Sequence, residues 1–274
     1  MSTEHPENDV ATVPLGGVLV SRLGLADTIS LMGGWLDDPM GQRRVATANL
    51  DFLALAHGDE QLQESLLLSD LVTADGAPLV WLSHLAGEPI AERVAGADFV
   101  VPLVGEAARR GRSVYFLGGS DEAGKETIEI LRARFPELIV AGQSAPMVNL
   151  ADVDACRAVA RSVAEAGADL VLVGFGCPKQ DFFIHHYLNE MNCRLAIGVG
   201  GTFNFITGRV RRAPPIWQKL GLEWFFRWMM EPRRLLGRYL NDARHLVRLV
   251  SQSKRYRGLG LSLPRPENKN DPID

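Results

Sequence analysis

The chain alternates short apolar stretches with segments of helical periodicity from residue 43 to residue 201. The stretches typical of strands are 43–49, 70–75, 113–119, 137–142, 168–176 and 193–201. Helical patterns lie between them, for example over 152–165 and over 121–134, which Ser120 precedes as a candidate N-cap. Apolar strands separated by helices predict a parallel sheet with helices on both faces, a Rossmann-like α/β fold.

Composition places the chain among globular proteins of one large domain with or without an appendage. Hydrophobic residues make up 46% and charged residues 23% of its 274 residues. No apolar run reaches the roughly 18 residues that span a bilayer. Residues 1–14 are polar and predict a flexible leader, without the pattern of a signal peptide. The three cysteines show no CxxC pairing, so we expect buried thiols in a reducing cytoplasm.

Positive charge is concentrated near the C-terminus. Between residues 205 and 260, thirteen Arg and Lys face three Asp and Glu, a net +10, so the rest of a chain of net charge −4 carries −14. Pro232 suits the start of a helix reaching about Lys254. Apolar residues on its predicted inner face are Leu236, Tyr239, Leu240, Ala243, Leu246, Val247 and Val250, and the cations opposite are Arg233, Arg234, Arg238, Arg244 and Arg248.

This basic amphipathic pattern, preceded by tryptophans and phenylalanines, favours a helix lying on an anionic membrane surface rather than on nucleic acid. The alternative is that the apolar stripe docks on the sheet domain while the arginines remain solvated. The predicted organisation is a leader over 1–14, an α/β catalytic domain over 15–208, a helical membrane-associating appendage over 209–258 and a disordered tail over 259–274.

Polar residues follow the first two predicted strands. Thr47 and Asn49 are two residues apart at one strand end, so we expect their side chains to point the same way. Asp75 ends the next strand and Gly76 follows it. Spacing leaves two interpretations of Asp75 balanced: an N-cap for a helix over 77–86, or a general base that accepts a proton from a hydroxyl.

Glycines mark the ends of two other predicted strands, in addition to the one followed by Gly76. Gly118 and Gly119 follow one strand, and "GFGCPKQD" (174–181) follows another, with Gly176 allowing close backbone approach. A helix starting near Pro178 would present free N–H groups there, with Lys179 and Gln180 in its first turn. Together these turns favour a nucleotide-type ligand. Asp152 and Asp154 fit helix capping better than a metal site, so no metal is expected.

Seven segments together resemble one known family, the WecG/TagA/CpsF glycosyltransferases (glycosyltransferase family 26). They are "TANLDF", "ADGAPLVW", "ERVAGADF", "VYFLGGS", "VGFGCPKQDFF", "IGVGGTFNFITGRVRRAP" and "GLEWFFRWMMEPRRLLGRY". The resemblance runs from about Val45 to Tyr239 in the family's order. It implies a fold of the GT-E type and an inverting, metal-independent enzyme that needs no cofactor. Such an enzyme transfers a sugar from a UDP-sugar to a polyprenyl-diphosphate-linked sugar during bacterial surface-polysaccharide assembly.

The resemblance also assigns roles to residues. Asp75 matches the family's proposed base, Thr47 and Asn49 line a sugar pocket, and Arg93 and Gln180 lie in family motifs. Basic residues of the appendage close over the leaving diphosphate, and those we favour are Arg227, Arg234 and Arg238. This chain has Asp181 where the family has Glu and Asn204 where it has Asp, so neither position is assigned as a catalytic acid.

The mechanism these roles imply is a single displacement. Asp75 takes the proton from an acceptor hydroxyl while glycine-turn amides and arginines stabilise the departing UDP. The implied location is the cytoplasmic face of the cell membrane, bound peripherally, and a homo-oligomer is left open. Two alternatives stand beside this hypothesis: a non-catalytic UDP-sugar-binding partner in a polysaccharide assembly complex, and a nicotinamide-dependent oxidoreductase, which lacks its glycine fingerprint here.

Overall fold

The computed structural model describes residues 10–214, 216–217, 221–230, 237, 245–246 and 248–250. The strands are β1 (Thr12–Leu15), β2 (Val18–Ser21), β3 (Arg43–Ala48), β4 (Leu71–Ala74), β5 (Ser113–Gly118), β6 (Ile139–Ser144), β7 (Leu170–Gly174) and β8 (Leu195–Gly198). The first helices are α1 (Leu25–Trp35), α2 (Leu50–Ala56), α3 (Glu60–Leu67), α4 (Ala77–Ala86) and α5 (Gly96–Arg109). The later helices are α6 (Asp121–Arg134), α7 (Val153–Glu165), α8 (Lys179–Met191), α9 (Thr202–Ile206) and α11 (Glu223–Met230).

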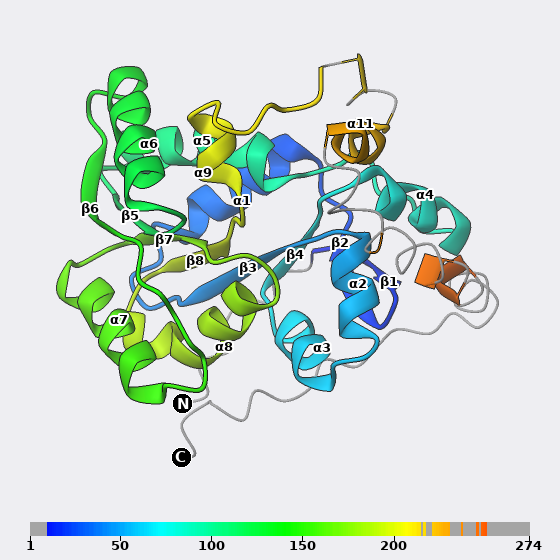
Figure 1. Ribbon diagram of the computed structural model, residues 1–274, viewed down its shortest axis with the longest axis horizontal. Helices are drawn as coiled ribbons and strands as arrows, with labels where there is room; N and C mark the ends of the chain where they lie inside the picture. The colour runs from blue at the N-terminus through cyan, green and yellow to red at the C-terminus, as the bar shows by residue number, and fades with distance from the viewer. Residues whose placement is uncertain are drawn as a thin grey trace.

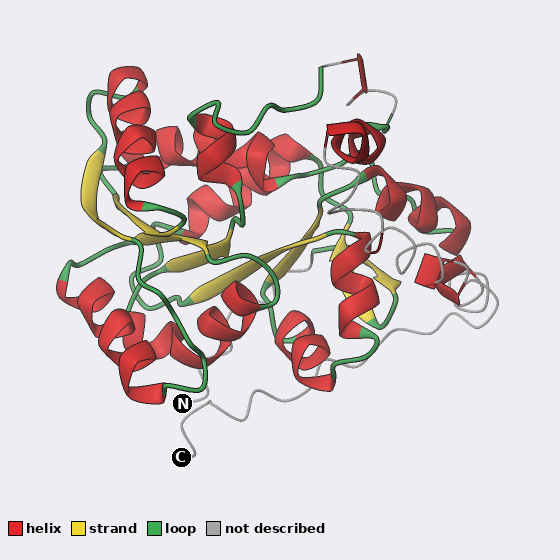
Figure 2. Ribbon diagram, viewed as in Figure 1, coloured by secondary structure: helices red, strands yellow, loops and turns green. Residues whose placement is uncertain are grey.

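Six parallel strands form the central sheet in the order β4-β3-β8-β7-β5-β6, which confirms the predicted Rossmann-like architecture. Helices α1, α5, α6 and α9 cover one face, and α2, α3, α7 and α8 cover the other (Figure 1). The strands lie between these helical layers (Figure 2). Neighbouring residues of each strand therefore face different cores: Leu170 and Leu172 belong to one buried cluster, and Val171 and Val173 to another.

The predicted elements coincide closely with the observed ones where the pattern is long. Helix α6 spans the predicted 121–134, and Ser120 caps it by accepting a hydrogen bond from the Ala123 amide at 3.2 Å. Asp152 caps α7 in the same way, 3.0 Å from the Ala155 amide, as the capping interpretation of this acid requires. Strand β6 begins two residues later than predicted, at Ile139.

An N-terminal hairpin of β1 and β2 was not predicted. The two strands pair antiparallel, and Val13, Leu15, Val18 and Val20 are fully buried in a core shared with α2, α3 and α4. The predicted leader over 1–14 is thus too long, because alternate side chains of residues 12–15 enter this core. Short strands of this kind leave little pattern in a sequence, and here Pro14 lies within the first.

The described part of the C-terminal segment packs against the same core. Leu249 is 3% exposed, and Leu246 and Val250 are packed beside it. A side chain at Gly16 of the hairpin turn would lie 2.7 Å from Leu249, so helix and turn are in close contact. Two residues of the predicted apolar stripe, Leu246 and Val250, therefore lie against the protein's own core, and the other five lie outside the described residues. Among the described residues, no helix is long and apolar enough to cross a membrane.

Candidate functional site

Hydrogen bonds connect the carboxyl ends of five adjacent strands into one rim. The Asp75 amide donates to Ala48 O at 2.7 Å, joining the ends of β4 and β3. Thr47 Oγ1 donates to Gly198 O at 3.0 Å, joining β3 to β8. The Val199 and Gly119 amides donate to the carbonyls of β7 residues, at 2.9 and 3.1 Å. Parallel α/β sheets bind ligands at this edge, so the rim is the candidate active site.

Asp75 lies half-buried directly beyond the last residue of β4. The N-cap of α4 is Gly76, whose φ of 150° and ψ of 142° turn the chain sharply before the helix. Asp75 therefore lies one residue before the N-cap position of α4. A carboxylate at this position, next to the end of β3, can accept a proton from a hydroxyl brought to the rim.

Thr47 and Asn49 occupy the neighbouring strand end but do different things. The Thr47 side chain is 6% exposed, and its hydroxyl is engaged with Gly198 O. Asn49 is half-buried and caps α2, where its Oδ1 accepts from the Phe52 amide at 3.1 Å. Capping uses only this oxygen, so the side-chain NH2 group of Asn49 can donate to a ligand hydroxyl, whereas Thr47 holds β3 against β8.

The glycines at the ends of β5 and β7 differ in how closely other atoms approach them. A Cβ at Gly118 would lie 2.8 Å from the Phe175 ring and 2.9 Å from the Gly174 backbone, with φ at 95°. Gly119 also has a positive φ, 71°. Gly176 differs, since it has a φ of 78° but no described atom within 4 Å of an added Cβ. The backbone at Gly176 is therefore the part of these turns that a ligand can approach most closely.

Gln180 and Lys179, at the start of α8, hydrogen-bond to backbone atoms of other segments near the rim. Gln180 is 1% exposed, and its Oε1 accepts from the Gly200 amide at 2.9 Å, which ties α8 to the turn after β8. Lys179 is exposed and its Nζ donates to Val148 O at 2.9 Å. Pro178 is the N-cap of α8, so both residues do lie in the first turn as expected.

Asp181, in the same helical turn, has the most perturbed environment near the rim. It is 5% exposed, and burial raises the pKa of its carboxyl to about 7. Hydrogen bonds from the Asp181 amide and from the Cys177 thiol oppose that rise in the pKa. Cys177 is half-buried, whereas the sequence predicted a buried thiol. Among the described residues, its Oδ2 has no hydrogen-bond partner.

Arg93 takes part in a closed ring of four charged side chains, the charge quartet (Arg93, Asp98, Arg212 and Glu223). Arg93 pairs with Asp98 at 2.8 Å and with Glu223. Arg212 pairs with Asp98 and lies 3.9 Å from Glu223. Of these four residues, the sequence pointed only to Arg93, although Arg212 and Glu223 also lie within family motifs, "RVRRAP" and "GLEW".

The structure does not describe the side chains of the three appendage arginines that the sequence favoured. Arg227 lies in α11, and its side chain is outside the described part of the structure, as are Arg234 and Arg238 entirely. Their predicted contacts with a diphosphate stay predictions. Within the described ranges, no group of three or more His, Cys, Asp or Glu side chains is placed to hold a metal ion.

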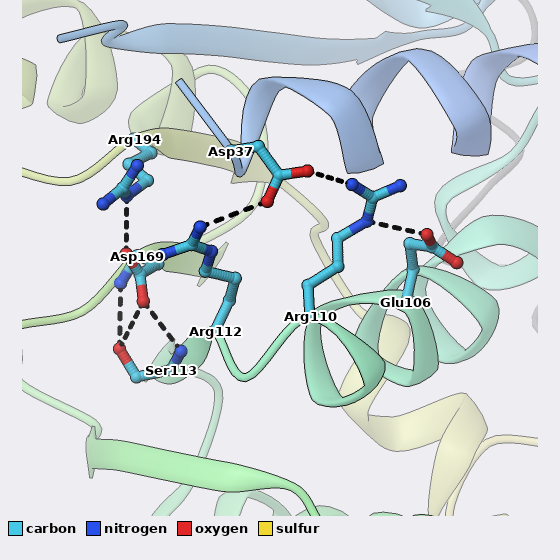
Figure 3. Close-up of polar contacts among 7 residues, drawn as sticks. All are labelled: Asp37, Glu106, Arg110, Arg112, Ser113, Asp169 and Arg194. Atoms are coloured by element: carbon cyan, nitrogen blue, oxygen red, sulfur yellow. Dashed lines mark hydrogen bonds and ion pairs between the residues drawn. The ribbon is translucent and has the colours of Figure 1, made fainter. Parts of the chain in front are cut away.

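A different set of ion pairs occupies the opposite, amino-terminal edge of the sheet (Figure 3). Arg110 pairs with Asp37 and with Glu106 at 2.7 Å. Arg194 binds Asp169 at 2.6 Å. These contacts fasten strand beginnings and helix ends, far along the strands from Asp75, so they have no place in the candidate site.

Comparisons with known proteins identify the family of the chain. The model of the glycosyl transferase WecG/TagA/CpsF family matches residues 13–258. A protein of Bacillus spizizenii named N-acetylglucosaminyldiphosphoundecaprenol N-acetyl-beta-D-mannosaminyltransferase is 33% identical over 190 residues, covering 69% of this chain and 72% of the relative. A Bacillus subtilis protein of the same name is 28% identical over 223 residues, covering 81% and 84%. The chain therefore belongs to the WecG/TagA/CpsF family of glycosyltransferases.

Proposed function

We propose that this glycosyltransferase moves an N-acetylhexosamine from a UDP-sugar to a sugar carried on polyprenyl diphosphate, in the assembly of a bacterial surface polysaccharide. The observation that carries the proposal is the placement of Asp75. It lies at the carboxyl end of β4, beside the end of β3, and Gly76 rather than Asp75 caps the following helix. The names of both relatives, which specify an N-acetylglucosaminyl-diphosphoundecaprenol acceptor and an N-acetylmannosaminyl group, support this substrate class.

The proposed reaction is one displacement at the anomeric carbon. Asp75 accepts the proton of the acceptor hydroxyl as its oxygen forms the new glycosidic bond. The bond from the anomeric carbon to the diphosphate oxygen breaks, and the electron pair leaves with UDP. Backbone amides at the glycine turns after β5 and β7 stabilise the negative charge that develops there. One displacement inverts the anomeric configuration.

The remaining partners belong to the same proposal. The acceptor is lipid-linked, so the enzyme works at a membrane surface, on its cytoplasmic side. The net charge of +10 over residues 205–260 supports attraction to anionic lipid. Neither a cofactor nor nucleic acid is part of the proposed activity.

The test is a panel of UDP-sugars offered with a synthetic lipid-diphosphate-N-acetylglucosamine acceptor and analysed by mass spectrometry. We expect a disaccharide product with UDP-N-acetylmannosamine and UDP release that depends on the acceptor. If another UDP-sugar gave the only product, the protein would still be a transferase, but its donor sugar would be that one. UDP-sugar binding without product for any donor would instead favour the non-catalytic binding partner.

A further inference from the structure

The charge quartet joins three segments of the chain: the start of α5, the stretch after α9 and the start of α11. Arg93 precedes α5, Asp98 lies in its first turn, Arg212 follows α9, and Glu223 begins α11. Each side chain is 17–27% exposed, and each acid contacts both arginines. Two positive and two negative charges thus balance within one partly buried ring, where solvent screens them less than on the surface.

The quartet lies against the end of the strand that carries Asp75. The amide of Val94, the residue after Arg93, donates to Ala74 O at 2.9 Å. Ala74 is the last residue of β4 and immediately precedes Asp75. The backbone of Arg93 is therefore fixed beside the proposed base, while its guanidinium is directed to Asp98 and Glu223.

Glu223 brings the appendage into this arrangement. It is the first residue of α11, and it connects that helix to Arg93. A second contact lies just before α11, where a Cβ at Gly221 would be 2.7 Å from Ala77 Cβ and 3.0 Å from Trp81 of α4. Both contacts hold the start of α11 to the segments that flank Asp75.

We propose that Arg93 is a positioning residue and not a substrate ligand. The charge quartet is the latch that fixes the start of α11 beside the Asp75 end of the rim. The effect of the latch on catalysis rests on the proposed function, whereas the existence of the latch does not. Removing one member leaves its partners with unbalanced charge in a partly buried place, which destabilises the docked helix.

The latch is tested without any substrate by hydrogen–deuterium exchange on the full chain. In Glu223→Gln we expect the amides of α11 to exchange about tenfold faster, equivalent to about 1.4 kcal/mol, while those of β3–β8 are unchanged. Asp37→Asn is the matched control, since it breaks an arginine–carboxylate cluster at the opposite edge of the sheet (Figure 3). Unchanged α11 exchange in Glu223→Gln would overturn the latch.

A double-mutant cycle separates positioning from substrate contact. Glu223→Gln, Arg93→Gln and their combination should change kcat by one common factor and the affinity for UDP by another, because each breaks the same latch. Arg212→Gln, which leaves the Arg93–Glu223 pair in place, should have a smaller effect than either. If Arg93→Gln alone weakened UDP binding and the two changes multiplied, Arg93 would be a substrate ligand and the proposal wrong. If the wild-type protein showed no transferase activity, the hydrogen–deuterium exchange of α11 in Glu223→Gln would decide whether the latch exists.

Discussion

Asp75 owes its position to its two neighbours along the chain. Ala74 ends β4 in the buried core, and Gly76 adopts a φ of 150° that lets α4 start one residue later. A β-carbon at residue 76 would disfavour that φ, so glycine suits this position. The side chain is consequently placed at the rim by backbone geometry.

Replacing Asp75 with Asn keeps the shape and removes the basic oxygen. We expect kcat to fall by about 100- to 10,000-fold, the usual contribution of a general base, with UDP affinity retained. Calorimetric titration with UDP and a product assay measure the two quantities. Asp154→Asn, on the exposed start of α7, is the control and should be fully active. Wild-type turnover in Asp75→Asn would refute the assignment of the base.

Asp181 makes folding depend on pH because burial raises the pKa of its carboxyl from 3.8 to about 7. The folded chain then binds more protons than the unfolded chain between these values, so this group lowers the free energy of unfolding as pH rises from about 4 to 7. His185, whose pKa burial lowers to about 4, acts in the opposite direction between about 4 and 6.5. The two contributions partly cancel in the wild type.

Asp181→Asn isolates the carboxyl. Relative to wild type, we expect the variant to gain unfolding free energy progressively from pH 4 to pH 7, by at most on the order of 4 kcal/mol. Urea unfolding at a series of pH values measures this difference, and the His185 contribution is common to both chains. A difference that stays constant over this range would show that the carboxyl titrates normally.

At the scale of elements, the turns after β5 and β7 contain glycines with two different purposes. Gly118 and Gly176 both have positive φ, but only Gly118 is crowded by protein atoms. Gly118 allows its turn to pack against residues 174 and 175, and Gly176 leaves space open at the rim.

Alanine at each position separates these purposes. Gly118→Ala should cost more than about 2 kcal/mol of unfolding free energy, from strain plus overlap with Phe175. Gly176→Ala should cost only about 1 kcal/mol yet raise the KM for the donor, because its Cβ enters the space the ligand approaches. Urea unfolding and steady-state kinetics measure both. Equal losses of stability with unchanged KM in Gly176→Ala would contradict this division.

Leu249 tests how firmly the last described helical turn is docked. Its side chain is buried against the hairpin and α2, so Leu249→Ala should lower the free energy of unfolding by about 2–3 kcal/mol. Met147→Ala is the control, since that methionine is fully exposed, and its effect should stay within about 0.5 kcal/mol. Denaturant titrations measure both variants, and a neutral Leu249→Ala would mean that the contact adds nothing to stability.

At the scale of the whole molecule, positive charge is concentrated in one segment of the chain and the rest is acidic. The +10 over residues 205–260 faces a remainder of −14. Leu246 and Val250 of the predicted apolar stripe, and Leu249 next to it, already pack on the protein's own core. Attraction to a membrane would then depend chiefly on the cations and on exposed apolar residues of α11, such as Trp224 and Met230.

Vesicle binding should therefore be electrostatic. We expect the chain to sediment with anionic vesicles at low salt, to be released as ionic strength rises, and to ignore neutral vesicles. Replacing Arg233, Arg234, Arg238 and Arg244 with Gln should weaken binding by about 1 kcal/mol per cation while keeping the apolar stripe. Binding that is indifferent to salt and to these changes would rule out this mode of membrane association.

The amino-acid sequence determines the layered α/β architecture by itself, because apolar periodicity and capping residues such as Ser120 and Asp152 act over a few neighbouring positions. It also places Asp75, Thr47 and Asn49 at strand ends, since parallel strands bring their carboxyl ends to one edge. Tertiary structure alone decided that Gly76 caps α4, that Gln180 is buried, that residues 12–15 form a strand and that Arg93 meets Glu223. These outcomes depend on contacts between residues far apart in the chain, whose energies no local pattern contains.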